Sequence, residues 1–245
     1  MLAVIASHAP LGMEGEIVSV EVDIRRGLPG IDVVGLPDGA VRESKERVRV
    51  AIRNSGYQFP ADRILISLAP AAVRKEGASF DLPIALGILA ASEQITPAEE
   101  CRAMVLGELN LGGGVRAVNG VLSAVGRGVE AGIDTFLVPR ENLREARVLG
   151  KGRVAGIGSL KEAALALQQP PNGSTPEDAD KQKGEAEAPG ITEDLSDIRG
   201  HKDLKRALEI AAAGRHHLLL FGPPGSGKTM AARRLPALLR AISRH

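Results

Sequence analysis

The sequence predicts a mixed α/β (α+β) protein with two domains joined by a linker, and three observations lead to this fold class. Segments with the periodicity of strands alternate with helical segments over residues 1–168. Residues 169–190 are almost free of large apolar side chains. Residues 191–245 contain a glycine-rich loop between an apolar run and a helical segment.

The first predicted strand covers residues 17–24. Its apolar side chains Val18, Val20, Val22 and Ile24 alternate with the polar Ser19, Glu21 and Asp23. This period of two indicates a half-buried strand. Residues 31–34 are predicted to form a partner strand, because glycines and a proline between the two segments turn the chain.

A helix is predicted next, from a cap at Asp38 to a stop at Asn54, Ser55 and Gly56. Its apolar stripe consists of Val41, Val48, Ala51 and Ile52. Its outer face carries Arg42, Glu43, Lys45, Glu46, Arg49 and Arg53. This face could contact phosphates, but the interleaved carboxylates favour a solvated helix face.

The remaining elements of the first domain continue the alternation. Strands are predicted at residues 64–68, 103–109 and 135–138, and helices at 81–92, 121–131, 141–149 and 160–167. This order favours helices layered on a sheet and excludes a helix bundle or an all-β sandwich. The first domain is therefore expected to end near residue 168.

Residues 169–190 change the composition abruptly to proline, glycine and charged or amide side chains. Such a segment buries too little apolar surface to offset the loss of chain entropy. It is expected to be a flexible interdomain linker, and a disordered recognition segment is the alternative.

The second domain contains a complete phosphate-loop motif, Gly222-Pro223-Pro224-Gly225-Ser226-Gly227-Lys228-Thr229. Residues 218–221 before it are predicted to form a buried parallel strand, and residues 230–235 after it open a helix. Glycines allow successive amides to point at a polyphosphate. Lys228 is expected to reach the β- and γ-phosphates and Thr229 to hold Mg²⁺. The predicted cofactors are therefore ATP and Mg²⁺.

Composition limits the other classes of function. The net charge is +1, so any anionic partner must meet a local patch, and aromatic residues make up only 2%, which argues against a base-stacking platform. The single Cys101 excludes an intramolecular disulfide and a multi-cysteine metal site. His216 and His217 have no acidic or cysteine ligand at useful spacing, so they are interpreted as the entry to a strand. No signal peptide or membrane-spanning run is recognisable, so a cytoplasmic protein is expected.

The motifs resemble a known family. Residues 197–201 (DIRGH), residues 206–214 (RALEIAAAG) and the phosphate loop resemble the start of magnesium-chelatase-type AAA+ ATPases. Upstream, residues 27–30 (GLPG), 34–37 (VGLP), 54–56 (NSG) and 75–85 (KEGASFDLPIA) resemble the YifB/ComM subfamily. The resemblance implies a Lon-protease-like, two-layer domain over residues 1–168 and an AAA+ motor beginning at 191–245. It also implies an ATP-driven hexameric ring acting on DNA during competence and recombination, as a branch-migration helicase.

The Lon-like part departs from its family at the catalytic pair. Lon-like peptidases use a Ser-Lys dyad, in which the lysine activates the serine hydroxyl. Ser79 aligns near the nucleophile, but Leu122 occupies the place of the lysine and cannot accept a proton. The first domain is therefore predicted to be non-proteolytic, with Ser79 in a loop or at a helix start.

The motor part departs from its family at its end. The residues after Thr229 suffice for one helix and include no acidic side chain to complete a Mg²⁺ site. A truncated form is therefore expected, with no catalytic residue in this chain, weak ATP binding at most, and hydrolysis only in a full-length form.

Three classes of function remain open on the sequence alone. The chain could be the front part of a DNA motor of the YifB/ComM type, or a chelatase subunit that helps insert Mg²⁺ into a porphyrin. It could also be a non-enzymatic module whose first domain docks a partner. The Lon-like domain ahead of the motor favours the first.

Overall fold

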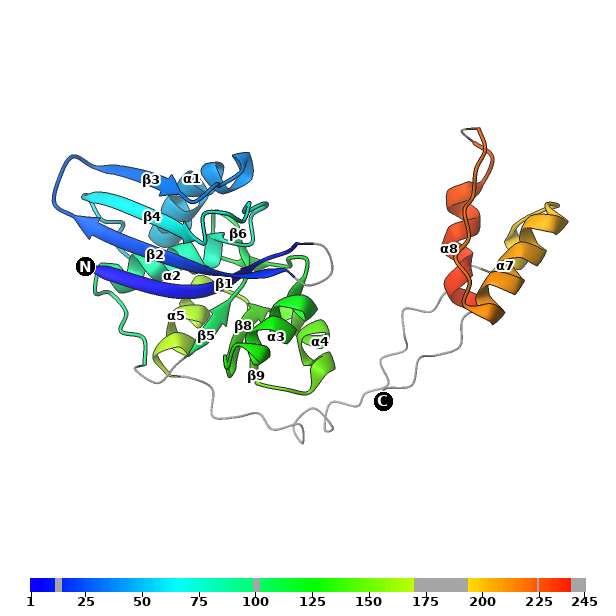
Figure 1. The fold of residues 1–245 in the computed structure, drawn as a ribbon. Coiled ribbons are helices and arrows are strands. Elements are labelled where there is room, and N and C mark those ends of the chain that lie inside the picture. Colours follow the sequence, from blue (N-terminus) through cyan, green and yellow to red (C-terminus); the bar gives the residue numbers. More distant parts are fainter. Residues whose placement is uncertain (12–14, 99–101, 170–193, 224, 239–245) are drawn as a thin grey trace. The chain divides into compact units, whose positions relative to one another are not determined.

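The computed structural model describes the chain except for residues 12–14, 99–101, 170–193, 224 and 239–245. The chain divides into two compact units, Met1–Asp180 and Lys181–His245 (Figure 1). Most of the expected linker lies outside the described residues, so the boundaries at 168 and 191 stay predictions.

A seven-stranded mixed sheet forms the centre of the first unit (Figure 1). Its strands, in spatial order, are β3 (Gly30–Val34), β4 (Arg63–Ala69), β2 (Glu16–Arg25), β1 (Leu2–Ala9), β5 (Ala103–Val105), β8 (Thr135–Pro139) and β9 (Arg153–Ile157). The β1–β2 and β2–β4 pairs are antiparallel, and the other four pairs are parallel. Strands β6 (Glu108–Leu109) and β7 (Val115–Arg116) form a separate small ribbon.

The alternation predicted for residues 17–24 is confirmed in β2. Val18, Val20 and Val22 are fully buried, whereas the intervening side chains are partly exposed. Val20 lies opposite Ile5 of β1 and Leu68 of β4, so three buried side chains meet across the middle of the sheet. Such cross-strand contacts stabilise a sheet and fix its register.

Helix α1 (Gly39–Asn54) begins and ends as the sequence predicts. The Asp38 carboxylate accepts a hydrogen bond from the Val41 amide at 2.8 Å, which satisfies a donor that the helix leaves free. The chain leaves the helix through Gly56, whose φ of +79° favours glycine.

Helices cover both faces of the sheet, but unequally. One face packs against α1, α5 (Leu160–Gln168) and α2 (Asp81–Ala91), and all residues of α2 are buried. On the opposite face, α3 (Val121–Glu130) and α4 (Leu143–Ala146) cover the part near β5, β8 and β9, and α3 also contacts β1 and β2 (Figure 1). The expected two layers therefore gain a third at this end of the sheet.

Strand β5 has a buried side chain on each face. Ala103 and Val105 belong to the core beneath α2, whereas Met104 belongs to the core beneath α3. Its neighbour β8 repeats this division, with Leu137 in the first core and Phe136 in the second.

Several predicted elements need correction. Strand β3 pairs with β4 and not with residues 17–24, because β4 inserts between them. The strand expected at residues 103–109 is two short strands in different sheets, and the helix expected at 141–149 is interrupted by 3₁₀ turns on both sides of α4. Strands β1, β7 and β9 were not predicted.

The second unit is small. It contains a 3₁₀ turn, η3 (Leu195–Asp197), and the helices α7 (Lys202–Gly214) and α8 (Lys228–Leu238). Ile198, Leu208 and Ala231 form its buried cluster. Across the described parts of both units, no helix combines the length and the apolar character that crossing a membrane requires.

Candidate functional site

The phosphate loop lies between α7 and α8. Gly222 and Pro223 precede the turn, Gly225 to Gly227 form it, and Lys228 and Thr229 open α8, while Pro224 is outside the described residues. Gly225 and Gly227 have φ angles of +81° and +76°. These angles confirm the expectation that the loop needs glycine for its backbone conformation.

The Lys228 ammonium group bonds back onto the loop. Its Nζ atom donates to the carbonyl oxygens of Gly222 at 2.8 Å and Pro223 at 2.7 Å, and to Ser226 Oγ at 3.3 Å. The positive charge is therefore held inside the curve of the loop, at the amino end of α8. A helix amino end and a cation together favour an anion.

The hydroxyl-bearing Thr229 lies in the first turn of α8 and is exposed. A threonine next to the phosphate-loop lysine is the residue type that binds Mg²⁺ beside a nucleotide. The donor set of loop amides, ammonium and hydroxyl fits a Mg²⁺-bound polyphosphate.

The strand predicted before the loop is wrong for this structure. Residues 218–221 form no strand, and the Leu219 and Phe221 side chains are 89% and 98% exposed. A strand requires a neighbour to satisfy its amides and carbonyls, and the described part of the second unit contains no other strand. The segment before the loop is thus held by the packing of the partly buried Leu220 and not by strand pairing.

A cavity of about 380 Å³ adjoins the loop. Its lining residues are Asp197, Ile198, Arg199, His201, Leu204, Gly225, Ser226, Gly227 and Met230. The DIRGH segment noted in the sequence therefore lies beside the phosphate loop. An apolar wall with a few polar groups is typical of a small-molecule site.

An ion pair fixes the DIRGH segment to α8. The Arg234 Nη2 atom lies 3.1 Å from an Asp197 carboxylate oxygen, and Arg234 Nε donates to the Asp194 carbonyl oxygen at 3.0 Å. The Arg234 side chain is only 11% exposed, whereas that of Asp197 is 45% exposed, so the ion pair is open to solvent on its Asp197 side. This contact and the buried cluster of Ile198, Leu208 and Ala231 together hold the DIRGH segment beside α8.

The two residues that bear on peptidase chemistry occupy separate elements. Ser79 is nearly buried in the turn before α2, and its carbonyl oxygen accepts a hydrogen bond from the Gly107 amide at 3.1 Å. It does not cap the helix, because α2 has no side-chain cap bond. Leu122 lies in the first turn of α3 and supplies no base.

Two buried charged side chains near Ser79 were missed by the sequence analysis. Lys75 is fully buried, its Nζ atom donates to the Pro70 carbonyl oxygen, and burial lowers the pKa of its ammonium group. Asp81 is also fully buried and accepts from Arg47 Nε at 3.0 Å. No sequence motif links Arg47 to Asp81, which lie far apart in the chain. The position of Asp81 at the start of an otherwise apolar helix is the sequence signal that indicates a buried carboxylate.

The outer face of α1 is less regular than the sequence suggested. Lys45 donates to the Ile31 carbonyl oxygen at 2.8 Å, and the Arg49 guanidinium stacks 5.7 Å from the centre of the Phe59 ring. Both cations therefore serve the fold of the first unit.

His216 and His217 are exposed, and no cluster of three metal-ligating side chains occurs among the described residues.

The fold and the loop define the class of protein: an α/β domain followed by a unit that carries a phosphate-loop motif. Matches to the sequence models of known protein families agree with this class. Residues 20–142 match the model for subunit ChlI of Mg-chelatase, and residues 194–245 match the model for magnesium chelatase, subunit ChlI. The chain belongs to this magnesium-chelatase ChlI family and is of its YifB/ComM type.

Individual relatives match nearly the whole chain. YifB from Escherichia coli (strain K12) is 41% identical over 248 residues, which cover 99% of this chain and 47% of the relative. The competence protein ComM from Haemophilus influenzae is 39% identical over 238 residues, covering 97% of this chain and 47% of the relative. The chain thus spans about half the length of these relatives.

A weaker match concerns the Lon proteases. The Lon protease from Geobacter metallireducens is 26% identical over 149 residues, which cover 58% of this chain and 18% of the relative. This match agrees with the Lon-like character that the family resemblance implies for the first domain.

Proposed function

We propose that the second unit binds ATP with Mg²⁺ through residues 222–229. The observation that carries the proposal is the position of Lys228. Two loop carbonyls hold its ammonium group against the loop, where it could neutralise the charge of a bound phosphate. The loop amides would bind the phosphates, Lys228 would neutralise their charge, and Thr229 would hold the metal ion. The cavity beside residues 197–204 is large enough to take part of the nucleoside.

Binding by this chain should be weak and without turnover. Residues 218–221 form no strand beside the loop, and the Leu219 and Phe221 side chains are exposed, so no strand pairing restrains the loop on this side. A loop that neighbouring strands do not hold in place loses more entropy when it closes on a ligand. Hydrolysis further requires a group that orients water, and the proposed site provides none.

Titration with a fluorescent ATP analogue tests this site. Lys228→Ala should weaken binding by about tenfold to a hundredfold, the range for losing hydrogen bonds to a charged group. Arg233→Ala, which removes the same charge from an exposed position in the same unit, should leave binding unchanged. Equal affinity of the two variants would contradict the assignment of the loop.

The metal contribution has its own test. Thr229→Val should abolish the increase in affinity that Mg²⁺ gives to the native chain, because it removes the hydroxyl and keeps the shape of the side chain. If Mg²⁺ strengthens binding equally in this variant, Thr229 is not the metal-holding residue.

We further propose that the longer proteins of this type are ATP-driven motors that act on DNA in the cytoplasm as hexameric rings. The support is the match to ComM, a competence protein, across both units. A role in inserting Mg²⁺ into a porphyrin is the second candidate, because both matched family models describe a chelatase subunit. ATP-dependent unwinding of branched DNA, compared with porphyrin metallation, separates the two in a protein that has the relatives' full length.

A further inference from the structure

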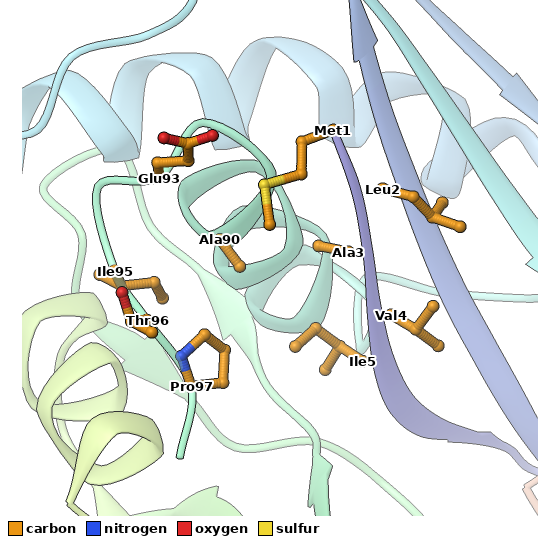
Figure 2. A pocket seen from close by; sticks show the side chains of 10 residues that line it. All are labelled: Met1, Leu2, Ala3, Val4, Ile5, Ala90, Glu93, Ile95, Thr96 and Pro97. Atoms are coloured by element: carbon orange, nitrogen blue, oxygen red, sulfur yellow. The ribbon is translucent and has the colours of Figure 1, made fainter. Parts of the chain in front are cut away.

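A groove of about 520 Å³ runs beside the first half of β1 (Figure 2). Its lining residues are Met1, Leu2, Ala3, Val4, Ile5, Ala90, Glu93, Ile95, Thr96 and Pro97. It lies within the first unit, and neither the phosphate loop nor Ser79 contributes to it.

The edge of β1 in this groove has backbone groups without a partner strand. Met1 and Ile24 exchange two backbone hydrogen bonds, at 3.0 and 3.4 Å. Because the pattern alternates along an antiparallel pair, the amides and carbonyls of Leu2 and Val4 point away from β2. Strand β5 begins only at Ala103 and pairs with β1 through Ala6, so no strand runs beside residues 2–5 on this side in the described structure.

The edge is apolar on both faces of the sheet. Ala3 and Ile5 point toward α2 and the groove, where Ala90 and Ile95 form the floor (Figure 2). On the other face, the side chains of Leu2 and Val4 are 60% and 56% exposed. Residues 2–7 include no charge and no proline, which are the usual means of blocking an exposed edge.

The groove is charged at one end. Glu93 lies at the end beside Met1, whereas Pro97 lies toward Ile5 (Figure 2). Glu93 is exposed in the turn after α2, where its amide donates to the Ala90 carbonyl oxygen at 3.0 Å. None of the ion pairs among the described residues involves its carboxylate. The Met1 ammonium at the same end lies 3.9 Å from the Asp23 carboxylate, which balances its charge. The Glu93 carboxylate can therefore complement a cation at this end of the groove.

We propose that this edge binds an extended segment of a partner protein as an additional strand of the sheet. The segment would hydrogen-bond to the backbone of Leu2 and Val4, as peptides do when they extend a sheet edge. Its side chains would alternate between the two faces of the sheet, with apolar residues at every second position over the floor at Ala90 and Ile95. A lysine or arginine at one end would pair with Glu93.

Fluorescence polarisation with the full chain tests the backbone contacts. The probes are fluorescein-labelled peptides Lys-Val-Thr-Val-Thr-Val and Val-Thr-Val-Thr-Val-Lys, which place the cation beside Glu93 in a parallel and an antiparallel pairing. At least one should bind saturably. Val4→Pro removes the amide that faces the groove, while the bonds of Ala3 and Ile5 to β2 remain, and should weaken binding by about tenfold or more. Val4→Thr keeps that amide and should bind like the native chain.

Exchange of charge tests the cation preference independently of the backbone. A further peptide carries glutamate in place of the lysine. Glu93→Lys should weaken binding of the lysine peptide and strengthen binding of the glutamate peptide, whereas Glu43→Lys, at an exposed position of α1, should change neither. This pair decides the question even if Val4→Pro fails to fold. Absence of binding by both peptides, or the same peptide preference in Glu93→Lys and Glu43→Lys, would overturn the proposal.

Discussion

Replacing Asp81 with asparagine should remove a pH dependence from the stability of the first unit. Asp81 accepts from Arg47 at 3.0 and 3.2 Å and from the Leu109 amide at 3.3 Å. Burial raises the pKa of Asp81 to about 6, although the hydrogen bonds and charge of Arg47 act to lower it. The same bond raises the pKa of Arg47. Burial prevails at Asp81 because its side chain is fully enclosed, whereas that of Arg47 is 27% exposed.

The size of the effect follows from the difference between the folded and unfolded states. An unfolded aspartate has a pKa of about 3.9, so a shift of roughly two units corresponds to about 3 kcal/mol. Because the folded pKa is the higher one, the folded state binds more protons between these two values. The stabilisation from protonated Asp81 is fully present below about pH 4 and is lost as the pH rises through about 6.

Urea unfolding of the native chain and Asp81→Asn measures this term. From about pH 4.5 to pH 7.5, the free energy of unfolding of the native chain should fall relative to the variant by about 2 kcal/mol, which is the part of the full shift that lies in this range. Glu46→Gln, an exposed change on the same helix as Arg47, should parallel the native chain. A constant difference between the native chain and Asp81→Asn over this range would show that Asp81 is ionised throughout, and would refute the reasoning.

Substitutions in both units test how their side chains pack. A Cβ atom at Gly128 of α3 would lie 2.5 Å from Phe136 Cε1, whereas at Gly126 the nearest atom is Leu149 Cδ1 at 3.6 Å. Thermal unfolding should therefore show Gly128→Ala to be destabilised by about 1–3 kcal/mol and Gly126→Ala to be stabilised by about 0.5–1 kcal/mol; equal changes would contradict the packing. Phe221→Ser should leave the helical circular dichroism of the second unit unchanged, because the ring is 98% exposed, and a loss of helix signal would show that the ring is buried in solution.

The local features of the fold could be predicted from the sequence. Val18, Val20 and Val22 alternate with polar residues, and Asp38 and Gly56 mark the ends of α1, so each pattern is complete within a few residues. Strand β1 was missed because its sequence does not alternate: the exposed Leu2 and Val4 are apolar, and the polar Ser7 and His8 are buried. The pairing of β3 was wrong because periodicity shows that a strand exists and does not show which strand lies beside it.

The same division holds for the candidate site. The phosphate loop is a continuous motif, and the φ angles of Gly225 and Gly227 agree with it. The ion pair between Asp197 and Arg234, and the one between Arg47 and Asp81, join segments separated by 37 and 34 positions. Only the folded chain brings such residues together.

Strand β5 has a consequence for how the first unit unfolds. The unit has two hydrophobic cores, one on each side of the sheet, and each could in principle lose its structure separately. Val105 of this short strand packs into one core and Met104 into the other, so opening either core removes the wall of its neighbour. The two cores should therefore melt in a single cooperative transition, with amide protons beneath α2 and α3 exchanging at a common global rate.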